Sequence, residues 1–166
     1  TVTNLTVLEN LMMVPGGQSG EKLVNALFKP SLVKKEEIKV KEKALKVIDF
    51  LNLKHLSNEL AGNLSGGQKK LLELARSIIN EPEILLLDEP LAGVNPKLAE
   101  DILSLITKLS DSGITILMVE HNIEAVMKIS ERIVVLAEGS LIADGIPNEI
   151  RTDSNVIEAY LGKADE

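Results

Sequence analysis

Two short groups of residues have types and spacing that could bind phosphate or act on it. The first is Leu64–Gln68. Ser65 and Gln68 are three residues apart with two glycines between them. That spacing is typical of a capping box, in which each side chain satisfies a backbone N–H at the start of a helix. Glycines allow a ligand to approach the backbone closely, and a helix N-terminus attracts anions. We therefore interpret Ser65, Gly66, Gly67 and Gln68 as a candidate phosphate-binding segment, with an ordinary helix cap as the alternative.

The second group, Asp88 and Glu89, follows the apolar run Ile84–Leu87. Such a run is typical of a buried parallel strand, and α/β proteins bind ligands beyond the carboxyl ends of these strands. Asp88 is a candidate magnesium ligand, acting through water, because magnesium keeps much of its hydration shell. Glu89 is a candidate general base or water-positioning group for attack on a phosphate. The alternative is a strand that ends in two solvated acids.

A histidine, His121, follows a second predicted strand, 114–119. It is placed to contact a phosphate, although a single histidine is more often structural. We assign no chemistry to His55, the other histidine of the chain. We interpret Glu120 as a solvated strand end rather than as a second acid of the site.

Composition narrows the classes of protein to which these groups could belong. The 166 residues carry a net charge of −7 and include no cysteine, which excludes a disulfide framework and a thiolate metal site and argues against nucleic-acid binding. Aromatic residues make up only 2%, so the core must consist of aliphatic side chains. No apolar run approaches the roughly 20 residues that cross a bilayer. We expect any association with a membrane to go through a partner.

The sequence pattern changes near Pro82. Residues 1–82 have helical apolar spacing, whereas 83–166 alternate strand and helix signals, which predicts a parallel sheet with helices on its faces. We therefore expect a helical subdomain over 1–82 and an α/β part over 83–166. The expected helices cover 36–51, 65–80 and the stretch that Pro96 opens and Gly113 stops, and the expected strands cover 84–87, 114–119, 133–136 and 141–143. Glu138-Gly139 predicts a tight turn between the last two strands.

These groups occur in the order and at the spacing of the ATP-binding cassette family, which the chain resembles over nearly its whole length. Leu64–Gln68 looks like the family signature motif, Ile84–Glu89 like its Walker B strand and His121 like its switch histidine. Leu91–Pro96 falls where the family has its D-loop, with Asn95 where many relatives carry aspartate. The resemblance implies part of a P-loop NTPase (RecA-like) core, preceded by the family's all-helical subdomain.

The resemblance also implies a mechanism in which two ATPase domains close head to tail. Ser65–Gln68 would contact ATP held by the opposite subunit. Glu89 would orient the hydrolytic water, His121 would contact the γ-phosphate and Asp88 would support magnesium. ATP and Mg²⁺ are then the implied cofactors. The implied partners are a second ATPase subunit and a membrane permease, reached from the cytoplasm at the inner face of the cell membrane.

Five further segments resemble the ATPases of branched-chain amino-acid importers: Leu5–Asn10, Leu60–Asn63, Gly93–Pro96, Glu120–Asn122 and Val156–Gly162. The resemblance implies a subunit that couples ATP hydrolysis to import, while the permease and a separate binding protein select the substrate. A soluble cassette ATPase of DNA maintenance or translation fits less well, since no coiled-coil or tandem-domain insertion occurs and the chain is acidic.

The sequence departs from the family pattern at the phosphate loop. No Gly-x-x-x-x-Gly-Lys-[Ser/Thr] motif occurs, and the cluster Gly16–Gly20 has no lysine at the right place and no preceding strand. Because that loop supplies most of the grip on the β- and γ-phosphates, we predict that these residues alone neither bind ATP tightly nor hydrolyse it. We also expect an open sheet edge or exposed apolar surface.

Two hypotheses about the chain follow from this departure. One is the signature-bearing fragment of a transport ATPase, with the phosphate, adenine-stacking and glutamine loops encoded before Thr1. The other is a non-catalytic interaction module that keeps the permease-docking fold. In-frame coding sequence for a phosphate loop upstream of Thr1 would favour the first.

Overall fold

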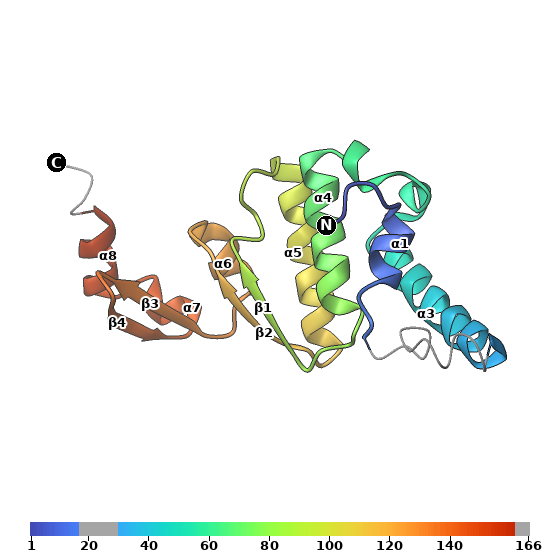
Figure 1. Ribbon diagram of the computed structural model, residues 1–166. Helices are drawn as coiled ribbons and strands as arrows, with labels where there is room; N and C mark the ends of the chain where they lie inside the picture. The colour runs from blue at the N-terminus through green and yellow to red at the C-terminus, as the bar shows by residue number, and fades with distance from the viewer. Residues whose placement is uncertain (17–29, 162–166) are drawn as a thin grey trace. The chain divides into compact units, whose positions relative to one another are not determined.

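The computed structural model describes residues 1–16 and 30–161 (Figure 1). Most of the rejected glycine cluster, 17–20, and the end of the importer-like segment, at Gly162, therefore lie outside the described residues. The chain forms two compact units, Thr1–Met118 and Val119–Glu166, and we describe each by itself. The predicted subdomain boundary at 82/83 remains a prediction.

Helices dominate the first part of unit 1. They are α1 (Val7–Met12), α3 (Pro30–Phe50), the short 3₁₀ turns η2 (Lys54–Leu56) and η3 (Ala61–Asn63), and α4 (Gly66–Ile78). α3 begins before the predicted 36–51, whereas α4 falls inside the predicted 65–80. The segment before α1 pairs with the turn before α4 through an antiparallel bridge between Thr6 and Leu60. α1 packs against both α3 and α4.

One buried polar side chain, Asn10, connects three parts of this helical region. Its exposed fraction is 0%. Its amide nitrogen donates to the carbonyls of Val2, Leu5 and Thr6, and its Oδ1 accepts from the Val2 N–H and from Arg76 Nη1 of α4. A buried amide that is fully hydrogen-bonded avoids the desolvation cost of an unpaired one. Asn10 therefore fixes the N-terminal segment to α1 and to α4.

The rest of unit 1 contains strand β1 (Ile84–Asp88), helix α5 (Pro96–Asp111) and strand β2 (Thr115–Val119). β1 and β2 are hydrogen-bonded neighbours in a parallel sheet, joined through α5 as a βαβ unit (Figure 1). The predicted strands 84–87 and 114–119 are confirmed to within a residue. The end of β2, at Val119, falls at the boundary between the units.

One face of this sheet is covered and the other is not. Leu85 packs into a core with buried residues of α4 and α5, and Leu87, Ile114 and Ile116 pack against it. On the opposite face the exposed fractions of Ile84, Leu86 and Leu117 are between 61 and 69%. The expected exposed apolar surface is therefore present. The core itself contains no aromatic side chain among the residues that the structure describes; its members from α4, β1 and α5 are Leu72, Leu74, Ala75, Ile78, Leu85, Leu105 and Leu109.

Unit 2 contains α6 (Ile123–Ile129), β3 (Ile133–Ala137), β4 (Ser140–Gly145), α7 (Pro147–Ile150) and α8 (Ser154–Leu161). β3 and β4 form an antiparallel hairpin whose two-residue loop is Glu138-Gly139. Both loop residues have positive φ, 51° and 78°, as a type I′ turn requires. The predicted tight turn is confirmed. Within the described parts of the chain, 1–16 and 30–161, no helix is long and apolar enough to cross a membrane.

Arg132 and Asp144 form a bidentate ion pair at the open end of the hairpin. Arg132 Nε lies 2.8 Å from Asp144 Oδ1, and its Nη2 lies 2.6 Å from Oδ2. The hydrogen bonds and charge of Arg132 lower the pKa of Asp144 from its ordinary value of 3.8. Because the pKa is lower in the folded state, the pair contributes stability above the unfolded-state pKa, and the contribution is lost as the pH falls through the folded-state pKa.

This sign gives a pH-dependent prediction for unit 2. The difference in unfolding free energy between the wild type and Asp144→Asn should be constant at neutral pH and should shrink as the pH falls below about 4. Urea unfolding followed by circular dichroism at a series of pH values measures it. Arg132→Gln should remove the same pH-dependent part. If Arg132→Gln retains it, Arg132 is not its cause.

Candidate functional site

The predicted capping box is present at the start of α4. Ser65 is the N-cap residue in extended conformation, and its Oγ accepts from the backbone N–H of Gln68 at 3.3 Å. In return Gln68 Oε1 accepts from the backbone N–H of Ser65 at 2.9 Å. Leu64, the residue before the N-cap, is buried, whereas Ser65 and Gly66 are exposed. The helix start is thus capped in both directions, and its first residues are exposed.

The two glycines of this segment have different surroundings. A Cβ added at Gly67 would collide with the side chain of Leu98, in the first turn of α5. A Cβ added at Gly66 would meet no atom within 4 Å, and the φ of Gly66 is not positive. Packing within the chain therefore favours glycine at 67, whereas neither packing nor backbone conformation requires it at 66. A helix cap explains Ser65 and Gln68 but not Gly66.

The two predicted acids stand at the carboxyl end of β1. Asp88 is the last residue of the strand, and both it and Glu89 are exposed. Glu89 has a φ of 43°, in the left-handed region that costs a residue with a side chain about 1–2 kcal/mol. The next two residues, Pro90 and Leu91, are buried, and their burial constrains the path of the backbone after Glu89. An observed outlier of this kind is a reason to suspect function.

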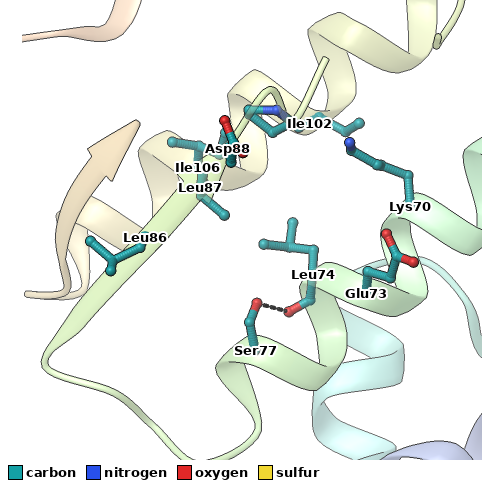
Figure 2. A pocket seen from close by; sticks show the side chains of 10 residues that line it. Lys70, Glu73, Leu74, Ser77, Leu86, Leu87, Asp88, Ile102 and Ile106 are labelled. Carbon is teal, nitrogen blue, oxygen red and sulfur yellow. Dashed lines mark hydrogen bonds between the residues drawn. The ribbon is translucent and has the colours of Figure 1, made fainter. Parts of the chain in front are cut away.

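Asp88 borders a pocket of about 220 Å³ between α4, β1 and α5 (Figure 2). Lys70 and Glu73 of α4 line it on one side, and Ile102 and Ile106 of α5 line it on another. Over 1–16 and 30–161, no three His, Cys, Asp or Glu side chains converge as a metal site. A single exposed carboxylate still suits magnesium, which commonly takes one or two carboxylates together with water and substrate phosphates. Asp88 therefore fits the predicted role without a larger ligand set.

Lys70 is the residue of this region that the sequence did not single out. Its Nζ donates to the backbone carbonyl of Glu89 at 2.9 Å, and that carbonyl also accepts from the Ala92 N–H at 3.1 Å. Since the partner is a backbone oxygen 19 residues away, no pairing of residue types could have indicated the contact.

Asn95 acts as a helix cap in the structure. Its side chain accepts from the backbone N–H of Leu98 at 2.9 Å, and Pro96 occupies the first helical position of α5. Gly93 has a φ of 72°, a conformation that glycine adopts at little cost. The loop between β1 and α5 is therefore shaped by Gly93 and Asn95.

His121 belongs to unit 2 and Glu89 to unit 1, so a shared site for the two residues remains a prediction. Its side chain is 72% exposed. The side chain of Glu120, by contrast, has an exposed fraction of 0%, and its Oε2 accepts from the backbone N–H groups of His121 and Asn122. The interpretation of Glu120 as a solvated acid is wrong, because its side chain has no exposed surface and its carboxylate accepts these two backbone hydrogen bonds. His121 Nδ1 lies 3.8 Å from the same oxygen.

A family model described as "ABC transporter" matches residues 2–92, which is more than half of the chain. The chain belongs to the ABC transporter family. A second model, described as branched-chain amino acid ATP-binding cassette transporter, matches residues 140–166 of this ABC chain.

Curated relatives and solved structures agree with this assignment. The probable branched-chain amino acid transport ATP-binding protein LivG of Archaeoglobus fulgidus is 43% identical over 97% of the chain and 62% of its own length. The high-affinity branched-chain amino acid transport ATP-binding protein BraF of Pseudomonas aeruginosa is 40% identical over 96% of the chain and 63% of its own length. The chain thus spans less than two thirds of these relatives.

Two crystal structures of ATP-binding cassettes from ABC transporters resemble the fold. One, in an ADP conformation, is 38% identical with a TM-score of 0.74, covering 96% of this chain and 64% of that one. The other, free of nucleotide, is 39% identical with a TM-score of 0.75, covering 95% and 63%. The predicted fold class, part of a P-loop NTPase with a parallel sheet, is confirmed.

The contrast between Gly66 and Gly67 is testable by stability alone. Gly66→Ala should leave the free energy of unfolding unchanged or raise it by up to about 1 kcal/mol, because alanine restricts the unfolded chain and meets no neighbour. Gly67→Ala should give a lower value than Gly66→Ala, because the Cδ2 end of the half-buried Leu98 side chain must shift to make room for the new methyl group. Urea unfolding of the two variants measures this. Equal losses at both positions would mean that Gly66 is also required for packing.

Proposed function

We propose that the protein is the ATP-binding subunit of an importer for branched-chain amino acids, coupling ATP hydrolysis to transport through a membrane permease. The observation that carries the proposal is the similarity, at 38–43% identity over nearly the whole chain, to proteins named for that transport. The match of residues 140–166 to the branched-chain model supports the same class. The capped, outward-facing start of α4 and the acids after β1 are compatible with it.

The signature segment would bind ATP held by a second ATPase subunit. Ser65 and the N–H groups at the start of α4 offer hydrogen-bond donors, and the positive end of the helix favours a phosphate. Gly66 leaves room for that phosphate, since none of the described residues has an atom within 4 Å of the position of its missing Cβ. A ligand that approaches from outside the chain accounts for a glycine that internal packing does not require.

The acids at the end of β1 would act on the phosphates of the chain's own ATP. Asp88 would hold Mg²⁺ through water, and the ion would supply charge neutralisation of the phosphate oxygens. Glu89, whose own backbone is left-handed and follows the strand directly, would orient the attacking water. His121 would contact the γ-phosphate, and Asn95 would shape the D-loop.

The proposed partners are a second ATPase subunit and the permease, with residues 1–82 docking onto the permease at the inner face of the cell membrane. The Asn10 network is compatible with this arrangement, because it connects the N-terminal segment, α1 and α4 by hydrogen bonds. A displacement at the docking region would then reach the signature segment at the start of α4. No nucleic acid is proposed as a partner, because the chain carries a net charge of −7.

Uptake by cells that express the protein tests the proposed function. Glu89→Gln should lower the uptake of radiolabelled leucine by about 100-fold or more, because loss of a general base commonly costs that factor. The control is Glu83→Gln, which changes an exposed acid just before β1 and should leave uptake unchanged. Unaltered leucine uptake in Glu89→Gln cells would contradict the assignment of Glu89, and loss of uptake of a different solute would redirect the substrate class.

The 166 residues by themselves are expected to show neither tight ATP binding nor turnover, because no phosphate-loop motif occurs in them. Isothermal titration with ATP and Mg²⁺, together with a phosphate-release assay, measures both properties. Glu89→Gln serves as the control. Turnover that Glu89→Gln abolishes would reveal a phosphate grip elsewhere in the chain and would contradict this prediction.

The non-catalytic interaction module remains the second candidate for the same reason, the lack of that motif. It predicts unaltered uptake in Glu89→Gln cells, so the uptake measurement also separates the two candidates.

A further inference from the structure

The first turns of α4 meet the loop after β1 at two places. Gly67 lies against Leu98, in the first turn of α5, so closely that a Cβ would collide with it. Lys70, three residues further along α4 and on the same face of the helix, donates to the carbonyl of Glu89 at 2.9 Å. The helix that begins with the signature segment therefore contacts both the start of this loop, at Glu89, and the first turn of α5, into which the loop leads.

The conformation of Glu89 needs support from outside its own backbone. Its φ of 43° is disfavoured for any residue with a side chain. The residue after it is Pro90, and a proline pushes the preceding residue towards extended conformations. The structure supplies the support at the Glu89 carbonyl, which accepts one hydrogen bond from the Ala92 N–H of the loop and one from the Lys70 ammonium of α4.

The Lys70 ammonium donates to this carbonyl although two carboxylates line the same pocket. Glu73 and Asp88 line the same pocket as Lys70 (Figure 2). A charged donor makes a stronger hydrogen bond to a carbonyl than a neutral donor does. The contact thus selects the backbone orientation at Glu89.

We propose that Lys70 is a positioning residue: its hydrogen bond holds the left-handed turn at Glu89 and so aims the Glu89 side chain. Because Lys70 and the signature segment belong to one helix, the bond also ties the conformation of Glu89 to the position of Ser65–Gln68 within one chain. The importance of this aim for hydrolysis rests on the proposed function of Glu89. The bond itself and its effect on the backbone do not.

Nuclear magnetic resonance of the isotope-labelled chain, without nucleotide, tests the proposal. Lys70→Met removes the donor while keeping the length of the side chain. It should shift the carbonyl carbon-13 signal of Glu89 and change its HN–Hα coupling, which reports φ. Lys70→Arg keeps a charged donor and should restore both values. Lys69→Met removes a charge one residue earlier on the helix and should leave both at their wild-type values.

Wild-type values of both quantities in Lys70→Met would overturn the proposal, as would equal changes in Lys69→Met. If Lys70→Met does not fold, the wild-type chain gives the answer through the nitrogen-15 relaxation of its lysine ammonium groups. The Lys70 ammonium should be more restricted than that of Lys69, and equal mobility would overturn the proposal. The expected changes at Glu89 in Lys70→Met, combined with unaltered uptake in Glu89→Gln cells, would support the positioning role of Lys70 and reject only the catalytic role of Glu89.

Discussion

The packing of α4 is the constraint on which the rest of unit 1 depends. Its buried side chains, such as Leu72 and Ala75, join the helical region to the sheet in a single aliphatic core. The same helix begins with the Ser65–Gln68 segment and contacts the loop after β1. Its Arg76 donates a hydrogen bond to the side chain of Asn10. An amphipathic helix can hold all these contacts because its faces are fixed relative to one another by helical periodicity. Any shift of α4 would therefore be felt at every one of them.

Local features of the fold could be predicted from the sequence, because their causes are local. The Ser65–Gln68 box, the Pro96 helix start and the Glu138-Gly139 turn each depend on residues within four positions of one another. Features that depend on distant partners could not. The contact of Lys70 with a backbone carbonyl and the different surroundings of Gly66 and Gly67 arise from tertiary packing. Glu120 failed for a different reason: its carboxylate faces backbone N–H groups that an ordinary strand end would leave to water.

The structure separates what the chain completes by itself from what it leaves open. The capped start of α4, the Asn95 cap of α5 and the hairpin are satisfied by internal hydrogen bonds. The outer face of the β1–β2 sheet and the space beside Gly66 have no such internal partner among the described residues. The first is apolar and suits burial by more polypeptide; the second lies at the N-terminus of a helix, where anions are favoured. These two open surfaces are thus chemically distinct and call for different occupants.

The left-handed backbone at Glu89 has a consequence for how this position can vary. Glycine or asparagine would adopt a φ of 43° with less strain than glutamate, so replacing Glu89 by either would relieve the backbone. A laboratory selection for thermostability would then favour loss of the carboxylate, whereas a selection for transport would retain it if the proposed role holds. The glutamate is thus a point at which folding and activity compete, and its frequency among evolved variants would record which of the two was under selection.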